Sequence, residues 1–333
     1  MAFIEVNQLV KEYKITVRNK GILSSLKSLL VPEHVMKRAV DGIDFSIERG
    51  ETVGFIGPNG AGKSTTVKML TGILAPTSGA VAIDGLSVFR ERKKVAARLG
   101  IVFGQRSQLW WDLPAIDTFE LLKHIYKIPA NAYKSNLEFF SEMLSLDEFI
   151  RQPVRQLSLG QKMRAEIAAA LLHDPEVILF DEPTIGLDVV AKEKIREFLR
   201  QVNRRKGTTM LFTTHDMQDI EKTCERMIII DRGKKIFDGS VGEIKNRFGG
   251  TRILAVEFTE ACDNVLLPGA DLVREKDNKK WFKFAKDQTD VSALIHTLSK
   301  RYGISDITVK EPEIEEVIRD IYEGGIARVE SVS

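Results

Sequence analysis

Apolar and polar residues alternate in patterns that predict a mixed fold over residues 1–248. Between residues 106 and about 156, apolar side chains recur every three or four positions, which predicts helices. Alternation along Ile43–Ile47 predicts a half-buried strand. Continuous apolar runs predict buried strands at Glu51–Ile56, Gly100–Phe103, Val177–Phe180, Thr208–Thr213 and Met227–Asp231. Buried strands that alternate with helices indicate an α/β fold with a parallel sheet.

The pattern changes after Gly249-Gly250, where a second domain is predicted. A helix with Val291, Leu294 and Leu298 on one face is expected, and another begins at Pro312. The strand candidates are Ile253–Phe258, Leu272–Arg274, Lys280–Phe284 and Ile304–Val309. We therefore expect residues 249–333 to form a small α+β domain with a structural or regulatory role.

One segment of the first domain stands apart from the strands around it. Gly21–Leu30 has apolar residues at the spacing of an amphipathic helix that ends before Pro32. Such a helix either packs on its own chain or contacts a membrane partner or the lipid surface.

Composition and charge narrow the classes of function. Of the 333 residues, 43% are hydrophobic and 29% charged, and the net charge of +2 gives no reason to expect a nucleic-acid partner. No apolar stretch is long enough to span a bilayer, and residues 1–13 have no secretory h-region. Cys224 and Cys262 are expected to be reduced residues of a cytosolic protein. Any association with a membrane must therefore come through partners.

The clearest chemical motif is a phosphate-binding loop between a predicted strand and a predicted helix. It reads Gly57-Pro58-Asn59-Gly60-Ala61-Gly62-Lys63-Ser64-Thr65. The glycines let backbone N–H groups surround phosphate oxygens, and the helix N-terminus favours an anion. Lys63 is expected to reach the β- and γ-phosphates and Ser64 to bind Mg²⁺. The alternative is a glycine-rich turn before a helix.

A pair of carboxylates, Asp181-Glu182, ends the predicted buried strand Val177–Phe180. The carboxyl edge of a parallel sheet is where such folds bind ligands. We expect Asp181 to bind Mg²⁺ and Glu182 to polarise an attacking water. The alternative is a strand that ends in solvated acids.

Further motifs occur in a defined order, and together they resemble the ATP-binding cassette (ABC) family, the ATPase subunits of ABC transporters. The resemblance covers Val6 to Phe248 and rests on Tyr13, the phosphate loop, Gln105, Leu157-Ser158-Leu159-Gly160-Gln161, Asp181-Glu182, Gly186-Leu187-Asp188 and His215. It implies a P-loop NTPase core of the RecA type, an antiparallel β subdomain and a helical subdomain at about residues 106–165. In this sense residues 1–248 are expected to be an ABC nucleotide-binding domain.

The resemblance also implies a role for each motif. Glu182, His215 and Gln105 are expected to be catalytic, and Ser64, Gln105 and Asp181 to bind Mg²⁺. The ATP contacts are expected from Tyr13, which stacks on adenine, and from Gly57, Pro58, Asn59, Gly60, Ala61, Gly62, Lys63, Ser64, Thr65, Ser158, Gly160, Gln161 and Asp188. An edge-strand aromatic is the alternative interpretation of Tyr13, and an ordinary surface residue that of His215.

The same resemblance implies partners. Cassettes of this family work as head-to-tail pairs, so Ser158 and the amides that open the helix after Gly160 are expected to face ATP on a second copy or on a homologous cassette. Leu159 stands where the family most often has Gly, and Ile185 where a small residue is usual, which puts the strength of this contact in doubt. Integral membrane permease subunits are the other expected partners, with the chain at the inner face of the cell membrane.

Three functions remain from the sequence. The phosphate loop, the Thr71–Gly79 run and the terminal helix look like bacterial drug, sodium and polymer exporter cassettes, so an exporter ATPase is favoured. An importer ATPase is the second possibility. A soluble cassette that acts on DNA or ribosomes is disfavoured, because no coiled coil separates Lys63 from Ser158 and the motifs occur once.

Trp110-Trp111 lies where cassettes of the family receive a helix of the membrane subunit. Adjacent side chains on a regular strand point to opposite faces, so both tryptophans cannot face the interior of one. At least one is expected to be exposed as an interface anchor. The alternative is that both pack inside the helical subdomain.

Overall fold

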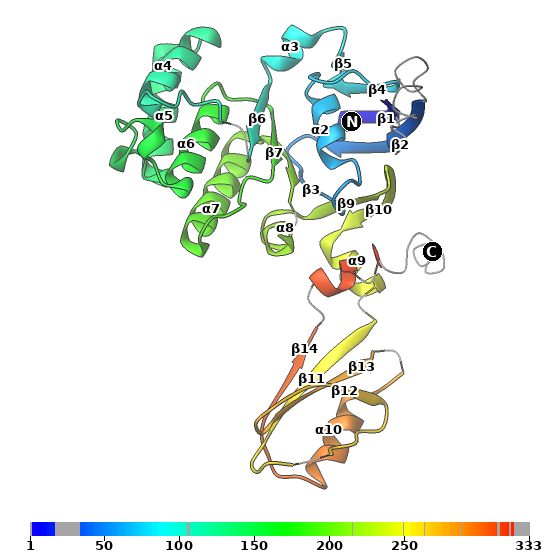
Figure 1. Ribbon diagram of the computed structural model, residues 1–333. Helices are drawn as coiled ribbons and strands as arrows, with labels where there is room; N and C mark the ends of the chain where they lie inside the picture. Colours follow the sequence, from blue (N-terminus) through cyan, green and yellow to red (C-terminus); the bar gives the residue numbers. More distant parts are fainter. Residues whose placement is uncertain are drawn as a thin grey trace, which may run out of the picture. The chain divides into compact units, whose positions relative to one another are not determined.

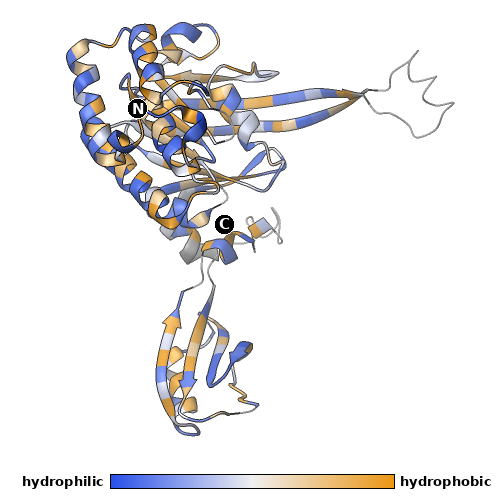
Figure 2. Cartoon of the chain, turned by 60° about the vertical axis from the view of Figure 1, so that its left-hand side comes forward, coloured by the Kyte–Doolittle hydropathy of each residue, from blue (hydrophilic) through white to orange (hydrophobic). Residues whose placement is uncertain are grey.

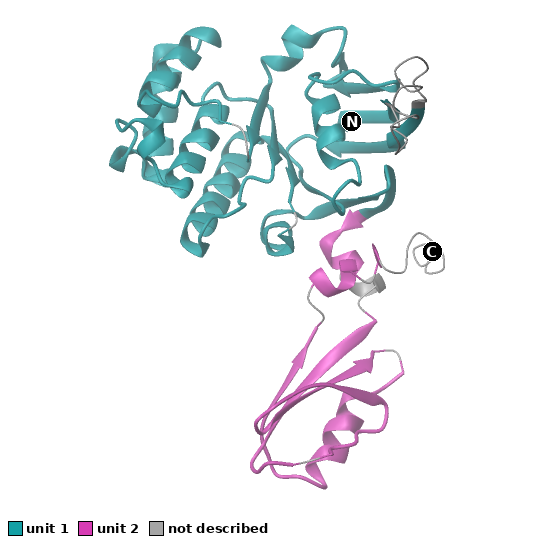
Figure 3. Ribbon diagram, in the orientation of Figure 1, with its two compact units in different colours: residues 1–238 teal, residues 239–333 magenta. Residues whose placement is uncertain are grey.

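The computed structural model describes residues 2–16, 34–104, 107–214, 216–248, 250–262, 264–286, 288–311, 314–319 and 321–322. It divides the chain into two compact units, Met1–Asp238 and Gly239–Ser333 (Figure 3). The division precedes helix α9 (Val241–Phe248), whereas the sequence analysis placed it after this helix. The amphipathic segment predicted at Gly21–Leu30 lies outside the described residues.

A six-stranded sheet forms the centre of the first unit (Figure 1). Its spatial order is β10 (Lys234–Ser240), β9 (Arg226–Asp231), β3 (Thr52–Ile56), β8 (Thr209–Thr213), β7 (Val177–Asp181) and β6 (Leu99–Phe103). Every pair from β9 to β6 is parallel, and β3, β7 and β8 are almost entirely buried. This confirms the predicted α/β fold and brings the carboxyl ends of these strands to one edge.

An antiparallel sheet shares its core with the central sheet. Its order is β2 (His34–Glu48), β1 (Ala2–Thr16), β4 (Ser78–Ile83) and β5 (Leu86–Ser87). Helix α2 (Lys63–Leu70) contributes Val67, Met69 and Leu70 to the same apolar cluster. The long β1–β2 hairpin extends away from this cluster (Figure 2). Both the antiparallel sheet and the central sheet therefore pack against α2, the helix that follows the phosphate loop.

Helices make up the other half of the first unit. They are α3 (Arg92–Ala96), α4 (Ala115–Ile125), α5 (Ala130–Leu144), α6 (Leu159–Leu171), α7 (Val189–Lys206) and α8 (Met217–Thr223), with 3₁₀ turns at Leu146–Glu148 and Val154–Gln156. The Phe140 and Phe198 rings of α5 and α7 meet edge to face, with centroids 5.3 Å apart. Across the described ranges, no helix has the length and apolar character to cross a bilayer.

Besides α9 and a helical segment at residues 314–319, the second unit contains an antiparallel sheet with a helix packed against it. The order is β12 (Ala270–Lys276), β13 (Lys279–Ala285), β11 (Thr251–Phe258) and β14 (Ile304–Lys310), and the helix is α10 (Val291–Ser299). Its core joins Leu254 and Phe282 of the sheet to Leu294 and Leu298 of the helix. The predicted α+β character of this segment is therefore confirmed.

A partly buried histidine, His173, is expected to make the first unit sensitive to acid. The His173 ring stacks on Tyr126 with centroids 3.8 Å apart, and its Nε2 lies 3.1 Å from the Leu99 carbonyl oxygen. Burial lowers the pKa of His173 to about 4, although the Leu99 carbonyl and Asp174 favour the charged form. The imidazole is therefore neutral in the folded chain at pH values where an unfolded chain would protonate it.

We expect the stability of the protein to fall as the pH is lowered from about 6.5 to 4, because only the unfolded state gains a proton at His173 in that window. The largest loss from this residue is about 3 kcal/mol. His173→Phe keeps the ring stack and should flatten the dependence of the melting temperature on pH. An unchanged slope in this variant would show that other groups cause the acid sensitivity.

Candidate nucleotide site

Four neighbouring parallel strands end at the edge where the predicted site residues lie. β3 leads into the phosphate loop (Gly57–Thr65), and β7 ends in Asp181 and is followed by Glu182. Gln105 and His215 lie outside the described residues, but each follows one of these strands by two residues, β6 or β8. At this edge the Gly104 N–H donates to the Asp181 carbonyl over 2.8 Å.

The phosphate loop has a backbone conformation that requires glycine at position 62. Gly62, which precedes α2, has φ of 109°, and a Cβ built there would lie 2.5 Å from the Ala39 carbonyl oxygen. The loop is also pinned by the β9–β10 turn, where the Gly233 N–H donates to the Ala61 carbonyl over 3.0 Å. Strand β2 and this turn thus fix the conformation of the loop at the start of α2.

Lys63 lies beneath the loop with only 7% of its surface exposed. Its Nζ donates to the Gly57 carbonyl at 2.5 Å and to the Pro58 carbonyl at 3.2 Å. Burial lowers the pKa of Lys63, while the nearby charges of Glu182 and Asp181 act in the opposite direction. An ammonium group held by backbone carbonyls at the base of such a loop suits an anionic phosphate, so the loop fits a nucleotide.

Three oxygen-bearing side chains meet beside the loop. Ser64 Oγ lies 3.5 Å from Asp181 Oδ1, and Thr213 Oγ1 donates to the same Oδ1 over 2.6 Å. A hydroxyl at the start of α2 and a carboxylate at the end of β7 are ligands that Mg²⁺ takes when phosphates and waters complete its shell. The residues therefore fit Mg²⁺. The sequence analysis missed Thr213, although its place at the end of β8 was a usable signal.

Glu182 has an unusual backbone for a residue that is not glycine. Its φ is 58°, in the left-handed region, and its N–H donates to the Thr213 carbonyl over 2.9 Å. The chain thus turns sharply at the end of β7 while it stays attached to β8. Local strain of this kind is concentrated at functional sites, which agrees with the role expected of this carboxylate.

The signature segment (Leu157–Gln161) starts α6 with a reciprocal cap. The Gln161 N–H donates to Ser158 Oγ over 3.2 Å, and the Ser158 N–H donates to Gln161 Oε1 over 2.8 Å. Because of this capping box the helix begins at Leu159, before Gly160 rather than after it as the sequence analysis expected. Figure 1 shows the starts of α2 and α6 well apart within one chain.

The two departures from the family pattern lie at the same place. A Cβ on Gly186 would be 3.0 Å from Leu159 Cδ2, so Leu159 packs on the turn that contains Ile185. Leu159 is 48% exposed and Ile185 41% exposed. The exposed surface beside Ser158 is therefore more apolar than the family pattern alone would give.

Comparisons with known proteins agree with the arrangement of this site. A family model described as "ABC transporter" matches residues 40–185. Linearmycin resistance ATP-binding protein LnrL of Bacillus subtilis (strain 168) is 30% identical over 86% of this chain and 94% of its own length. Nod factor export ATP-binding protein I of Ralstonia nicotianae is 32% identical over 80% of this chain and 82% of its own length. The chain belongs to the ABC transporter family.

Solved structures agree with this assignment. The dimeric structure of a post-hydrolysis state of the ATP-binding cassette MJ0796, bound to ADP and Pi, is 29% identical with a TM-score of 0.59. The match covers 72% of this chain and 98% of that one. As an ABC ATP-binding protein, the chain binds and hydrolyses ATP.

The remaining predicted contacts of this ABC protein are Tyr13 and Asp188. Tyr13 is 39% exposed on β1 and pairs with Lys37 of β2, two residues before the Ala39 carbonyl that abuts the loop. The register thus puts this exposed ring on the strand beside the one that contacts the loop, and its contact with adenine stays a prediction. Asp188 caps α7, where its Oδ1 accepts from the Ala191 N–H over 2.8 Å.

We expect Glu182→Gln and Lys63→Ala to impair the enzyme in different ways. Glu182→Gln keeps the size of the side chain but removes the base, so ATP binding should persist while turnover falls by about 100-fold or more. Lys63→Ala removes a direct phosphate contact and should weaken ATP binding itself. Equilibrium binding of a fluorescent ATP analogue and steady-state turnover separate the two effects. Turnover near the wild-type rate in Glu182→Gln would show that another group is the base.

Proposed function

We propose that this chain is the ATPase subunit of an exporter, whose substrate passes through separate membrane subunits. The observation that carries the ATPase part of the proposal is the edge of the central sheet where Lys63 and Ser64, at the start of α2, meet Asp181 and Glu182, at the end of β7. This set of groups suits the cleavage of a phosphate anhydride.

Each group has a defined task in the proposed site. The loop N–H groups and Lys63 hold the β- and γ-phosphates, and Tyr13 stacks on the adenine. Ser64, Asp181 and Gln105 hold Mg²⁺, which when bound neutralises phosphate charge. Glu182 accepts a proton from the attacking water, and His215 donates to the γ-phosphate. Thr213 keeps the Asp181 carboxylate oriented through its 2.6 Å hydrogen bond.

The site is proposed to be complete only between two copies of the chain. Ser158 is exposed at the N-terminus of α6, a helix that Figure 1 shows apart from α2, the helix that follows the phosphate loop. A helix N-terminus attracts an anion, so the signature segment suits the γ-phosphate bound by a second copy. The exposed Leu159 and Ile185 add apolar area to the same contact.

We expect the specific ATPase activity of the isolated chain to rise with its concentration, because a monomer lacks half of each site. Ser158→Arg should abolish this activity without unfolding the protein, since it places bulk and charge on an exposed surface at the partner's γ-phosphate. The lost N-cap of α6 should lower the melting temperature by only a few degrees. Turnover per chain measured from nanomolar to micromolar protein, together with light scattering, tests both. A rate that does not depend on concentration in a proven monomer would contradict the two-chain site.

Export rather than import is supported by the names of the relatives, which refer to linearmycin resistance and to Nod factor export. An importer ATPase stays the second candidate. A gene for an extracytoplasmic binding protein beside this one would favour import. In either case we place the chain at the inner face of the cell membrane, held there by its permease subunits.

The permease subunits are proposed to dock on the helical part of the first unit. Trp110 and Trp111 are 51% and 57% exposed, so the alternative that both pack inside is wrong. The Lys162 ammonium, which directly follows the signature segment, lies 5.3 Å from the Trp111 ring centroid. Contact at Trp111 can therefore act on the start of α6, which links the docking surface to the ATP of the second copy.

We expect Trp110→Ala and Trp111→Ala to uncouple hydrolysis from transport. The exposed rings contribute little to folding, so basal ATPase activity and the melting temperature of the isolated chain should change little. Transport by the reconstituted complex should fall by about tenfold or more if the rings anchor the permease. Exposed Ile73, 53% accessible and outside this surface, provides a matched Ala control. Parallel loss of both activities with a lower melting temperature would show that the pair serves folding.

A further inference from the structure

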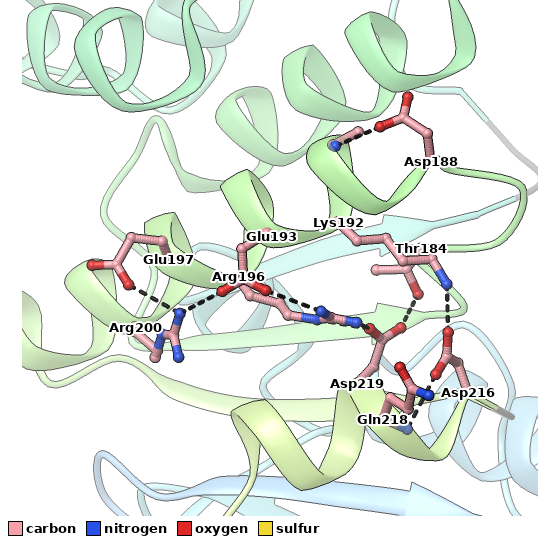
Figure 4. A network of polar contacts seen from close by, with 11 residues as sticks. Thr184, Asp188, Lys192, Glu193, Arg196, Glu197, Arg200, Asp216, Gln218 and Asp219 are labelled. Atoms are coloured by element: carbon pink, nitrogen blue, oxygen red, sulfur yellow. Dashed lines mark hydrogen bonds and ion pairs between the residues drawn. The ribbon is translucent and has the colours of Figure 1, made fainter.

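A buried polar cluster joins the loops that follow β7 and β8 (Figure 4). Asp219 of α8 accepts hydrogen bonds from Thr184 Oγ1 and from the Arg196 guanidinium of α7, whose Nε lies 2.9 Å from Asp219 Oδ1. The three residues are 5% to 6% exposed, so water does not compete for these contacts. We call Thr184, Arg196 and Asp219 the Asp219 clamp.

The clamp holds both ends of the segment that leaves β7. Thr184 follows Glu182 by two residues, and Arg196 lies two helical turns after Asp188, yet both donate to one carboxylate. Between them the chain makes a tight turn, in which the Leu187 N–H donates to the Thr184 carbonyl over 3.2 Å. Gly186 permits this turn with φ of 72°.

A second contact ties α7 to Asp216, the N-cap residue of α8. Lys192, one turn before Arg196, donates to Asp216 Oδ2. The other oxygen of Asp216 caps α8 by accepting from the Gln218 N–H over 3.1 Å. Asp216 directly follows His215 in the sequence. The same face of α7 therefore holds the loop after β7 and the start of the helix after β8.

Because Arg196 and Asp219 are buried, their hydrogen bonds must be kept for the charges to be tolerated. A charged group away from water is tolerated only when its partners satisfy it, and Arg196 has a further contact at 3.1 Å with Glu193. A shift of α8 against the β7 loop would leave the Asp219 carboxylate and the Thr184 hydroxyl without their partners. The two loops are thus constrained to one relative position.

We propose that Asp219 is a positioning residue for ATP hydrolysis. Through Thr184 it sets the backbone that follows Glu182, and through α8 it sets the segment that begins after His215. Misplacement of a catalytic group by about 1 Å can lower a rate on the order of 100-fold, so this constraint bears directly on turnover. The inference rests on the proposed role of Glu182 as the base.

The decisive variant is Thr184→Val, which keeps the shape of the side chain and the Arg196–Asp219 ion pair but removes the hydroxyl. The measurements are kcat, the KM for ATP and the melting temperature of the full-length chain, at a protein concentration where specific activity no longer rises. We expect kcat to fall by about tenfold or more, with the KM for ATP within about twofold. Thr184→Ser restores the hydroxyl and should restore kcat.

A second variant and a control complete the test. Asp219→Asn should lower kcat in the same way, and it decides the outcome if Thr184→Val does not fold. Glu197→Gln removes an exposed contact with Arg200, at 3.0 Å on the same helix, and should leave kcat unchanged. Wild-type kcat in folded Thr184→Val, or equal kcat values for the Val and Ser variants, would overturn the proposal.

Glu182→Gln, assayed in parallel, distinguishes failure of this inference from failure of the proposed site. An inactive Glu182→Gln together with a fully active Thr184→Val would leave the base assignment intact and overturn the clamp. An active Glu182→Gln would instead overturn the assigned base, and with it the positioning of Glu182 that we ascribe to Asp219.

Discussion

The parallel pairing of β7 with β8 is the constraint on which the rest of the site depends. It places Asp181 opposite Thr213 at the ends of the two strands, where the threonine hydroxyl donates to the carboxylate over 2.6 Å. The same pairing continues one residue further, where the Glu182 N–H donates to the Thr213 carbonyl. Since β3 lies on the other side of β8, the phosphate loop and Ser64 reach the same edge.

Two buried carboxylates link the segments that surround this edge of the sheet. Asp219 joins the loops beyond β7 and β8, and Glu166 of α6 joins the helical part to the segment after β6. The Glu166 carboxylate accepts from Ser107 Oγ and from the Gln108 N–H, the latter over 3.2 Å. Burial raises the pKa of Glu166, while these donors act in the opposite direction. Satisfied contacts of this kind favour one arrangement over its neighbours, because any other leaves a buried group without a partner.

The residues that we propose to contact partners are exposed and fall into two surfaces. Ser158, Leu159 and Ile185 lie at one accessible surface, and Trp110 and Trp111 lie at another that reaches α6 through Lys162. In the proposed function the first surface receives a second copy and the second receives the permease. Both surfaces include or contact the first turn of α6. A displacement of that helix would therefore change the contact with the second copy and the contact with the permease together.

The sequence by itself determined the elements and the family. Strong local signals, such as the apolar run before Asp181 and the glycines before Lys63, predicted the strands, the phosphate loop and the α/β class, and the second unit followed from its own periodicity. The tertiary structure decided which polar residues support one another. Thr213, Thr184, Arg196 and Asp219 carry no motif, and their roles depend on strand register and helix packing between segments far apart in the chain. The start of α6 at Leu159 depended on a reciprocal cap that the spacing of Ser158 and Gln161 allows but does not require.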